Sequence, residues 1–354
     1  MQEMKKVTVA MSGGIDSAVA ALLAVEAGYE VSGATLRLCS KLDADGRDLT
    51  DSDIADAEAI CQRLGIPYRV YDMRDRFHDT VIRDFIDTYL DGGTPNPCIV
   101  CNRIMKFGAL LDAELDSGAD LVATGHYARL ERREDGRMLL KKAADAHKDQ
   151  TYMLWSLTQK QLLHSLFPLG DLTKPEIRRI GEEHGFVIAH KSDSQDICFV
   201  PDGDYASFIE RERGEKYPEG DYIDEDGKIL GRHKGVIHYT IGQRKGLGIS
   251  MGRHIFVTKK DAVTNTVTLA DEDRLFTDTV VLRGINLIPF DAIEGRIRIK
   301  AKIRYRHEES DAYAEQTGSD EITLTFDQPQ RAPAKGQSAV LYDGDYVVGG
   351  GIIQ

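Results

Sequence analysis

The sequence predicts an α/β protein with a parallel-sheet domain, a small linking domain and a C-terminal β-barrel-like domain. Three features lead to this prediction. Short β-branched runs alternate with helical patterns over roughly the first 200 residues, which is typical of a parallel sheet. Gly and Asp turn signals then recur about every ten residues, and the last region carries only short β-rich runs. A length of 354 residues is enough for roughly two to three domains.

The N-terminal region begins as strand, glycine turn and helix. An apolar run from Lys6 to Met11 stops at a serine and two glycines, and an Ala- and Leu-rich helical pattern follows from Ile15 to Gly28. The same alternation continues along the chain, which supports the parallel sheet. We predict further strands at Glu30–Leu36, Tyr68–Tyr71 and Asp120–Gly125, a helix at Asp51–Leu64, and a helix after Lys174 and Pro175.

The change of character near Pro201 sets the predicted domain boundaries. We expect the α/β domain over residues 1–200, the linking domain over 201–277 and the all-β domain over 278–354. The β-rich runs in the two later domains are His254–Lys259, Val267–Ala270, Thr279–Leu282 and Ser338–Tyr342.

Composition places the chain among ordinary globular proteins. Hydrophobic residues make up 42% and charged residues 29%, which excludes a largely disordered chain. The longest apolar run, Ala18–Val25, is far shorter than the roughly 20 residues that span a bilayer. No charged-then-apolar leader opens the chain, so we expect a cytoplasmic protein.

The net charge of −13 argues against a protein that coats nucleic acid with its whole surface, since phosphate binding depends on Lys and Arg. A local basic patch is compatible with this total. The acid-rich stretch from Lys41 to Glu58 lacks the spacing of a calcium loop, and we interpret it as a solvated loop and helix start.

A candidate nucleotide site lies where the first strand meets its helix, at Ser12-Gly-Gly-Ile-Asp-Ser17. Two glycines let backbone N–H groups approach phosphate oxygens, and the helix N-terminus adds partial positive charge. No lysine follows the second glycine, so this is not a Walker A loop. Asp16 is a candidate either for holding Mg²⁺ or for positioning the loop. The alternative is a tight turn capped by Ser and Asp.

The loop resembles the SGGxDS signature of the PP-loop ATP pyrophosphatase superfamily. The resemblance implies the PP-loop (adenine nucleotide alpha hydrolase-like) fold, ATP bound through its pyrophosphate, and adenylation of an acceptor oxygen. That superfamily contains ligases, amidotransferases and sulfurtransferases, so other residues must distinguish among them.

Five cysteines form an odd set in a chain too long to need disulfide staples. Cys98 and Cys101 form a CxxC pair after a proline-rich segment, and Arg103 and Lys106 are close enough in sequence to favour the thiolate. Cys198 stands alone, far along the chain. A buried structural cysteine is the alternative for any one of them, and a zinc site is disfavoured because no fourth ligand can be assigned.

The two remaining cysteines, Cys39 and Cys61, lie in strand-like and helix-like runs, and we interpret them as buried structural residues.

Several further motifs resemble the tRNA 2-thiouridylase family of the same superfamily. They follow that family's order from about Val7 to the GGGII near the C-terminus, essentially the whole chain. The motifs are TPNPCxxCN at Thr94–Asn102, ATGHY at Ala123–Tyr127, KDQTY at Lys148–Tyr152, DSxxICF at Asp193–Phe199 and GQRKGLG at Gly242–Gly248.

This resemblance implies an ATP-dependent tRNA-uridine 2-sulfurtransferase that acts on the wobble uridine, position 34 of tRNA. ATP with Mg²⁺ would adenylate the C2 oxygen of the uracil, so that AMP leaves. Cys198 matches the cysteine that carries sulfur as a persulfide, supplied by a cysteine desulfurase or a sulfur-relay protein. Cys101 matches the partner nucleophile. Direct persulfide attack, with a Cys101–Cys198 disulfide formed afterwards, and release of sulfide in the pocket both stay open; either needs a lowered thiol pKa and a water-excluding pocket.

The other site residues are carried over motif by motif. Positions that match nucleotide contacts are Ala10, Met11, Ser12, Gly13, Gly14, Ile15, Asp16, Ser17, Leu36 and Gly125. Positions that match contacts with the target base or the tRNA are Asn96, Pro97, Cys98, His126, Lys148, Asp149, Gln150, Arg304, Tyr305 and Gln337. The target base would have to leave its stack to be reached.

Cys98 departs from the pattern, because some family members carry Asp there as a candidate proton-transfer group. A carboxylate acid or base is therefore not carried over to this position. Cys98, Cys101 and Cys198 are instead a candidate ligand set for a [4Fe–4S] cluster, since clusters prefer thiolate ligands.

Two basic segments are candidates for contact with RNA. Cations alternate with other residues from Arg296 to Arg306, which in a strand would give one basic face about 33 Å long. The alternative is a solvated strand face, which would usually mix charge signs. In the loop Gly242–Gly248, Arg244 and Lys245 stand between glycines, as a grip for phosphate or as a plain interdomain turn.

Two rival functions are kept beside tRNA thiolation. A PP-loop synthetase or amidotransferase acting on a small carboxylate would need neither the cysteines nor the basic run. An RNA-binding protein that uses ATP only as an allosteric ligand would have no use for intact cysteines beside a pyrophosphatase loop.

Overall fold

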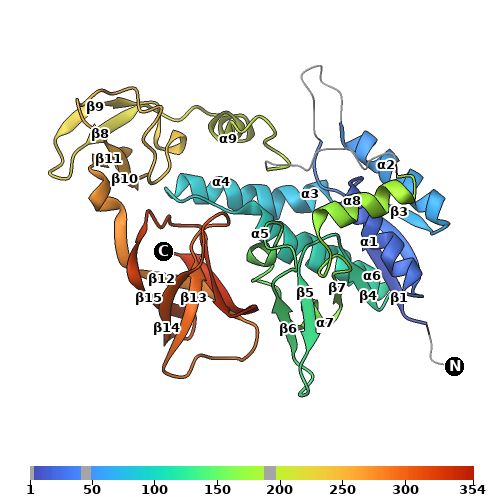
Figure 1. The fold of residues 1–354 in the computed structure, drawn as a ribbon. Coiled ribbons are helices and arrows are strands. Elements are labelled where there is room, and N and C mark those ends of the chain that lie inside the picture. The colour runs from blue at the N-terminus through green and yellow to red at the C-terminus, as the bar shows by residue number, and fades with distance from the viewer. Residues whose placement is uncertain (1–3, 41–48, 187–196) are drawn as a thin grey trace. The chain divides into compact units, whose positions relative to one another are not determined.

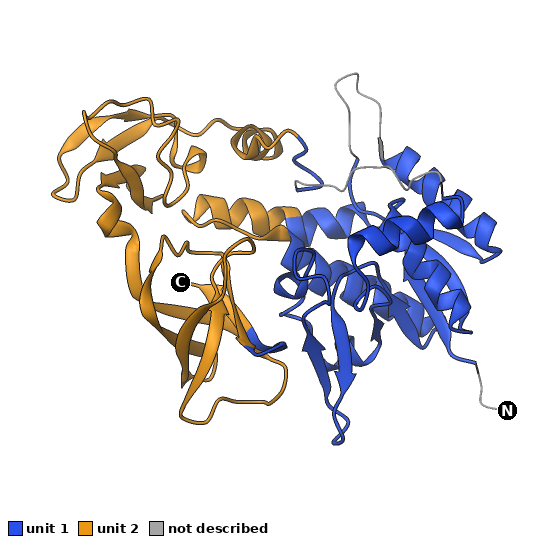
Figure 2. Ribbon diagram, in the orientation of Figure 1, with its two compact units in different colours: residues 1–81, 98–201, 343–349 blue, residues 82–97, 202–342, 350–354 orange. Residues whose placement is uncertain are grey.

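The computed structural model describes residues 4–40, 49–186 and 197–354. The chain forms two compact units (Figure 2). Unit 1 comprises residues 1–81, 98–201 and 343–349, and unit 2 comprises residues 82–97, 202–342 and 350–354. The chain therefore passes from unit 2 back into unit 1 between Pro97 and Cys98, inside the TPNPC motif.

Unit 1 is built on a five-stranded parallel sheet in the order β3-β2-β1-β4-β7 (Figure 1). The predicted parallel sheet is thereby confirmed. Its strands are β1 (Lys6–Ala10), β2 (Glu30–Arg37), β3 (Tyr68–Asp72), β4 (Leu121–Ala123) and β7 (Ser165–Leu166).

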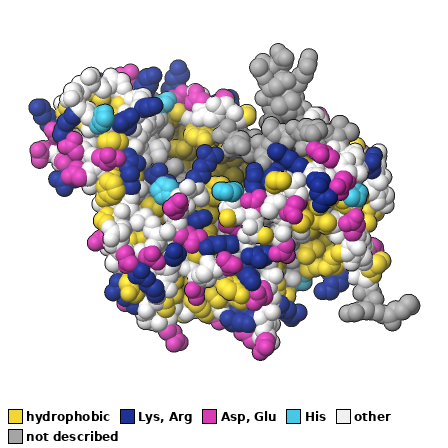
Figure 3. All heavy atoms as spheres, in the orientation of Figure 1, with side chains coloured by type: hydrophobic (Ala, Val, Ile, Leu, Met, Phe, Trp, Pro, Cys, Tyr) yellow, Lys and Arg dark blue, Asp and Glu magenta, His cyan; other side chains and the backbone are white. Residues whose placement is uncertain are grey.

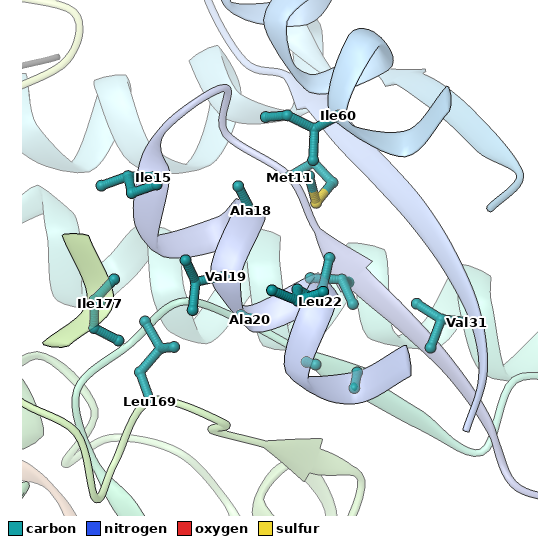
Figure 4. Packing of buried hydrophobic residues seen from close by; sticks show 14 of the residues in the cluster. Met11, Ile15, Ala18, Val19, Ala20, Leu22, Val31, Ile60, Leu169 and Ile177 are labelled. Carbon is teal, nitrogen blue, oxygen red and sulfur yellow. The ribbon is translucent and has the colours of Figure 1, made fainter. Parts of the chain in front are cut away.

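Helices cover both faces of this sheet. Val7 and Val9 of β1 join a core with α1 (Ile15–Glu26), α2 (Leu49–Leu64) and α8 (Lys174–Glu183). On the other face, Ala34 and Val122 pack against the π-helix η2 (Asn102–Leu110) and α6 (Leu111–Asp116). Figure 4 shows the first core, in which Val19 and Leu22 of α1 lie among residues from β2, α2 and α8.

The remaining elements of unit 1 surround this framework. The helix α3 (Arg74–Phe77) continues into the π-helix η1 (His78–Ile82) and then α4 (Arg83–Leu90) of unit 2, and α5 (Pro97–Cys101) continues into η2. The others are β5 (Arg129–Arg132), β6 (Met138–Lys141), the 3₁₀ turn η3 (Thr151–Met153) and α7 (Gln159–Leu163).

Unit 2 contains a four-stranded sheet and a barrel. The sheet has the order β10-β11-β8-β9, and β12 to β17 pair as β12-β15-β14-β13-β16-β17, with a further β12–β17 pairing that closes them into a barrel. Its elements are α9 (Tyr205–Arg213), β8 (Gly220–Ile223), β9 (Ile229–His233), η5 (Val236–His238), β10 (Phe256–Asp261), β11 (Thr266–Ala270), η6 (Glu272–Leu275), β12 (Phe276–Leu287), β13 (Arg296–Lys302), β14 (Ser310–Gly318), β15 (Glu321–Arg331), β16 (Ser338–Asp343) and β17 (Tyr346–Ile353), whose first residues belong to unit 1.

In the described part of the chain, no helix is both long and apolar enough to cross a membrane. Part of the acid-rich stretch, residues 41–48, lies outside the described residues, as do residues 193–196 of the DSxxICF motif.

Candidate active site

The candidate nucleotide loop, residues Ser12–Ser17, lies between β1 and α1 at the carboxyl edge of the parallel sheet; it is called the nucleotide loop below. β1 is flanked by β2 on one side and by β4 on the other, so the loop sits where the strand order reverses. Ligands of open α/β sheets bind at such switch points. Gly13 has φ +71° and a Cβ there would collide with the carbonyl oxygen of Asp53, so both the conformation and the close approach require glycine.

The loop is held by its two serines. The hydroxyl of Ser17 donates to the carbonyl oxygen of Gly14 (2.9 Å) and accepts from the backbone N–H of Ser12 (3.2 Å). Gly14 is extended and stands at the N-cap of α1 without a side-chain cap. The first N–H groups of α1 are consequently available to an anion.

Asp16 is engaged by two residues that the sequence did not indicate. Lys174 donates from Nζ to Oδ1 (2.8 Å) and Oδ2 (2.9 Å) of Asp16, and the hydroxyl of Tyr127 donates to Oδ1 (2.9 Å). The Lys174 side chain is only 7% exposed. Both carboxylate oxygens of Asp16 are therefore engaged within the protein. The sequence did contain one signal for this contact. The helix dipole disfavours a lysine at the start of a helix, so a lysine at that position indicates an acidic partner.

Four other candidate nucleotide residues lie around the loop, and two of them have buried side chains. Met11 and Ile15 are buried in the core below the loop, so only their backbones face the site. Leu36 lies next to the last residue of β2, at the same edge of the sheet. Gly125 follows β4, and a Cβ there would lie 2.8 Å from the carbonyl carbon of Asp16 and 2.9 Å from the N of Ser17. The ATGHY motif therefore packs closely against the nucleotide loop at Gly125.

The three candidate reactive cysteines gather in unit 1. Cys101 is buried, whereas Cys98 and Cys198 are exposed. Charge on Cys198 would raise the pKa of both Cys98 and Cys101, and Lys106 acts on the same two thiols in the opposite direction. The pair lies on α5, and Lys106 on the following η2 acts on both thiols, as predicted, while Arg103 is not among the charges that act on them.

The expected low thiol pKa is wrong for Cys101. Burial raises its pKa to about 12, and Lys106 offsets this only in part. Desolvation by the surrounding protein also raises the pKa of Cys98. Both thiols are therefore protonated at neutral pH, and a nucleophilic Cys101 needs a base or an incoming positive charge to activate it.

The structural assignment of the other two cysteines is confirmed for one of them. Cys61 is fully buried in α2, and burial raises its pKa to about 11. Cys39 follows the end of β2 and is only half-buried, so it is not the buried strand residue that we expected.

His126 follows Gly125 in the ATGHY motif and is buried. It is 8% exposed, its Nδ1 lies 2.8 Å from the hydroxyl of Thr124, and its ring packs near Phe107 and Phe167. Burial, and then Lys106, hold its pKa well below the usual range, so the imidazole is neutral at physiological pH.

Two residues of the KDQTY motif use their side chains inside the protein. Gln150 accepts from the backbone N–H of Tyr127 at 2.9 Å. Asp149 accepts from the N–H of Ala143 (2.9 Å) and the hydroxyl of Thr151 (2.6 Å). These bonds fix the turn after β4, whereas Lys148 is half-buried in the same segment.

In unit 2, Gln337 holds the segment that leads to the CxxC pair. Its amide donates to the carbonyl oxygens of Thr94 (2.9 Å) and Pro95 (3.1 Å), and the N–H of Thr94 donates to the carbonyl oxygen of Lys335 (2.7 Å). Asn96 follows half-buried, and Pro97 opens α5, a position that suits proline.

The predicted basic face of residues 296–306 is wrong in two respects. β13 ends at Lys302, so the run is not one strand, and it spans about 23 Å rather than 33 Å. Its exposed cations also face acids, because Arg296 pairs in register with Glu315 and Lys300 with Asp311.

Arg298 is the clearest case, since its guanidinium binds both carboxylate oxygens of Asp327, at 2.7 and 2.5 Å. Arg304 lies beyond the strand and donates to the carbonyl oxygen of Ala332 (2.5 Å), with Tyr305 exposed next to it. Figure 3 likewise shows Lys and Arg interspersed with Asp and Glu on the face drawn.

The cysteines do not fit the [4Fe–4S] cluster that we considered. Within residues 4–40, 49–186 and 197–354, no three His, Cys, Asp or Glu side chains converge as a metal site. Thiolates that hold one cluster must surround it, so these residues as placed do not form that ligand set.

Comparisons with known proteins match the order of the parts along the chain. Three family models match the chain: the tRNA methyl transferase HUP domain over residues 5–202, the tRNA methyl transferase PRC-barrel domain over 206–271, and the aminomethyltransferase beta-barrel domain over 278–353.

Similar solved structures include the U34-tRNA thiolase NcsA from Methanococcus maripaludis with its [4Fe–4S] cluster. It is 18% identical, with a TM-score of 0.38 over 60% of this chain and 68% of that chain. A 4-thiouridine synthetase–RNA complex with bound ATP is 18% identical, with a TM-score of 0.35 over 59% and 50%. Neither similarity is high enough to inform on the function of this chain.

The curated relatives are much more similar. The tRNA-specific 2-thiouridylase MnmA of Clostridioides difficile is 46% identical over 99% of this chain and 98% of the relative. The protein of the same name from Acetivibrio thermocellus is 47% identical over 99% of both chains, and that from Treponema denticola is 47% identical over 99% and 98%. Identity at this level along the full length shows the family, and the chain belongs to the tRNA-specific 2-thiouridylase MnmA family.

Proposed function

We propose that this chain replaces the C2 oxygen of the wobble uridine of tRNA by sulfur, using ATP. One observation carries the proposal: the charge of Lys106 acts both on a residue next to the nucleotide loop and on the thiols. Gly125 touches the backbone of Asp16 and Ser17, His126 follows it, and Lys106 acts on His126 as well as on Cys98 and Cys101. An activated oxygen and a sulfur nucleophile would therefore meet in one unit.

The residues suggest how the steps divide. The loop Ser12–Ser17 would hold ATP through the N–H groups at the start of α1, with the backbone conformation fixed by Gly13. Mg²⁺ would accompany the ATP, and because Lys174 already occupies both oxygens of Asp16, we assign Asp16 to the loop rather than to the metal. Attack of the C2 oxygen on the α-phosphate would release pyrophosphate and leave an adenylated uracil.

Sulfur would then enter from Cys198, loaded as a persulfide by a cysteine desulfurase or a sulfur-relay protein. In the direct route, the terminal sulfur attacks C2 and AMP leaves with the oxygen. The Cys101 thiolate next attacks Sγ of Cys198, which frees the 2-thiouridine and leaves a Cys101–Cys198 disulfide that an external thiol must reduce. In the other route, the Cys101 thiolate first attacks Sγ of the Cys198 persulfide, which forms the Cys101–Cys198 disulfide and releases sulfide; the sulfide then attacks C2, and AMP leaves. The exposure of Cys198 suits a residue that must be loaded by a second protein.

Two other descriptions are less well supported. The family models carry methyl transfer in their descriptions, and a synthetase or amidotransferase was a rival from the sequence. Neither gives a role to Cys198 or to the pair Cys98 and Cys101 on which Lys106 acts, whereas sulfur transfer does. A cytoplasmic location would follow from a tRNA substrate.

The test incubates the purified full chain with ATP, Mg²⁺, a cysteine desulfurase, cysteine and unmodified tRNA. Mass spectrometry of the nucleosides should find 2-thiouridine, together with AMP and pyrophosphate. A tRNA with cytidine at the wobble position is the substrate control, and Cys61→Ser is the matched protein control. The proposal fails if wild type forms no thiouridine, or if Cys198→Ser is fully active.

A further inference from the structure

The loop Gly242–Gly248 of unit 2 is rigidly anchored. Its ends are tied to the sheet and to a buried tyrosine: Gly242 N–H donates to the carbonyl oxygen of Val257 (2.8 Å), and the Tyr222 hydroxyl donates to that of Leu247 (2.7 Å). Between them, the Gln243 side chain accepts from the N–H of Thr240 (3.0 Å) and donates to the carbonyl oxygen of Lys245 (3.0 Å). The two side chains in the middle of the loop are thus presented from a fixed backbone.

Those two side chains, Arg244 and Lys245, are exposed cations. No acid among the described residues forms an ion pair with either of them. Neighbouring arginines of the same sheet region behave differently, because each has a carboxylate partner: Arg232 with Asp221 (2.7 Å), Arg274 with Glu225 (3.1 Å), and Arg253 with Asp271. In a chain of net charge −13, two adjacent exposed cations give this loop a local positive charge.

The loop adjoins a second positive feature. A Cβ on Gly242 would lie 3.1 Å from Cβ of Ala332, whose carbonyl oxygen accepts from Arg304. Arg304 and Arg331 both depress the pKa of the half-buried His307, after burial itself. Arg331 is paired with Glu272 (3.0 Å), whereas the guanidinium of Arg304 binds a backbone carbonyl.

We propose that the loop Gly242–Gly248 binds backbone phosphates of the tRNA through Arg244 and Lys245, next to the turn that carries Arg304. This inference rests on the proposed function and names a part of its RNA-binding surface. An open, exposed pair of cations has no enclosing wall for a small anion, whereas a polyanion gains from several weak phosphate contacts at once. Fixing the backbone in advance lowers the entropy lost when the phosphates are bound.

The test measures tRNA affinity by filter binding over a series of salt concentrations. Each phosphate contact contributes about 0.7 to 0.9 to the slope of log K against log salt, so Arg244→Gln with Lys245→Gln should reduce the slope by about 1.5. Affinity should fall on the order of tenfold near 0.1 M salt and little at 1 M. The matched control is Arg232→Gln with Arg253→Gln, which makes the same change in net charge at cations already paired with acids and should change affinity less than about threefold.

The outcomes separate the two proposals. Equal slopes for the loop variant and wild type would overturn the role of the loop, even if thiolation were slower. An equal loss in both double variants would also overturn it, because net charge alone would then be responsible. Failure of wild type to bind tRNA at all would overturn the proposed function instead. Thermal unfolding and ATP binding of the loop variant should match wild type, since both side chains are exposed.

Discussion

The nucleotide loop and the cysteine site lie in the same unit, but they are assembled differently. The loop Ser12–Ser17 is held mainly by bonds within itself, and its backbone is already in a conformation that exposes N–H groups. The cysteine site joins α5 to a turn far along the chain, and burial keeps the thiols of Cys98 and Cys101 protonated. If the proposed function holds, the ATP site is formed before the substrate arrives, whereas sulfur transfer requires a change in the surroundings of Cys101.

The strongest test of this difference is Cys101→Ser. We expect a loss of tRNA thiolation on the order of 10³-fold or more, because a hydroxyl replaces the nucleophile, while ATP affinity stays within about twofold of wild type. Thiouridine formation and calorimetric ATP binding measure the two effects. A large loss of ATP affinity would contradict this prediction, because it would show that the cysteine site and the nucleotide loop are energetically coupled.

The second test compares Gly13→Ala with Gly28→Ala. Both glycines have positive φ, at +71° and +82°, so each variant should lose about 1–2 kcal/mol of folding stability. Only at Gly13 does the new Cβ also meet backbone, since nothing lies within 4 Å of that position at Gly28. ATP affinity should therefore fall about tenfold or more in Gly13→Ala and remain normal in Gly28→Ala. Equal affinities would contradict the prebuilt loop.

The third test concerns the contact between Lys174 and Asp16. Lys174→Met leaves a partly buried carboxylate with only Tyr127 as a partner, which should cost about 1–3 kcal/mol of stability and weaken ATP binding several-fold. Adding Asp16→Asn should recover part of the stability, because the isolated charge is then removed. Urea unfolding of the two single variants and the double variant gives the coupling energy. Additive effects would mean that the ion pair does not position the loop.

The smallest effect is expected from Lys106→Met. Alkylation of Cys101 by iodoacetamide should rise about tenfold for each pH unit up to a pKa of about 12, since only the thiolate reacts. Removing Lys106 takes away the charge that lowers this pKa, so the rate at any given pH should fall a few-fold. Peptide mass spectrometry reads the modification. An unchanged rate would separate Lys106 from the thiols.

The raised pKa of Cys101 also makes the folding stability depend on pH. The folded chain keeps this proton where the unfolded chain releases it, so the contribution is full below pH 9 and is lost as pH rises towards 12. In Cys101→Ser this part of the alkaline loss of stability should disappear.

Local patterns were enough for much of unit 1. Strand, glycine turn and helix at residues 6–28 follow from side-chain period and from the two glycines, and the structure has them as predicted. Long-range pairing was not available from the same patterns. The acids that oppose β13, such as Asp327 facing Arg298, lie on other strands, and a periodicity of two cannot show what stands across the sheet.

The sequence by itself determined the parallel sheet and the glycine turn at Ser12–Ser17 between its first strand and helix, because these depend on residue type and on neighbours a few positions away. Only the tertiary structure decided that Lys174 engages Asp16, that Gln337 holds Thr94, and that Cys101 is protonated. The physical reason is that charge, pKa and exposure depend on the atoms that surround a group in space, and those atoms come from distant parts of the chain.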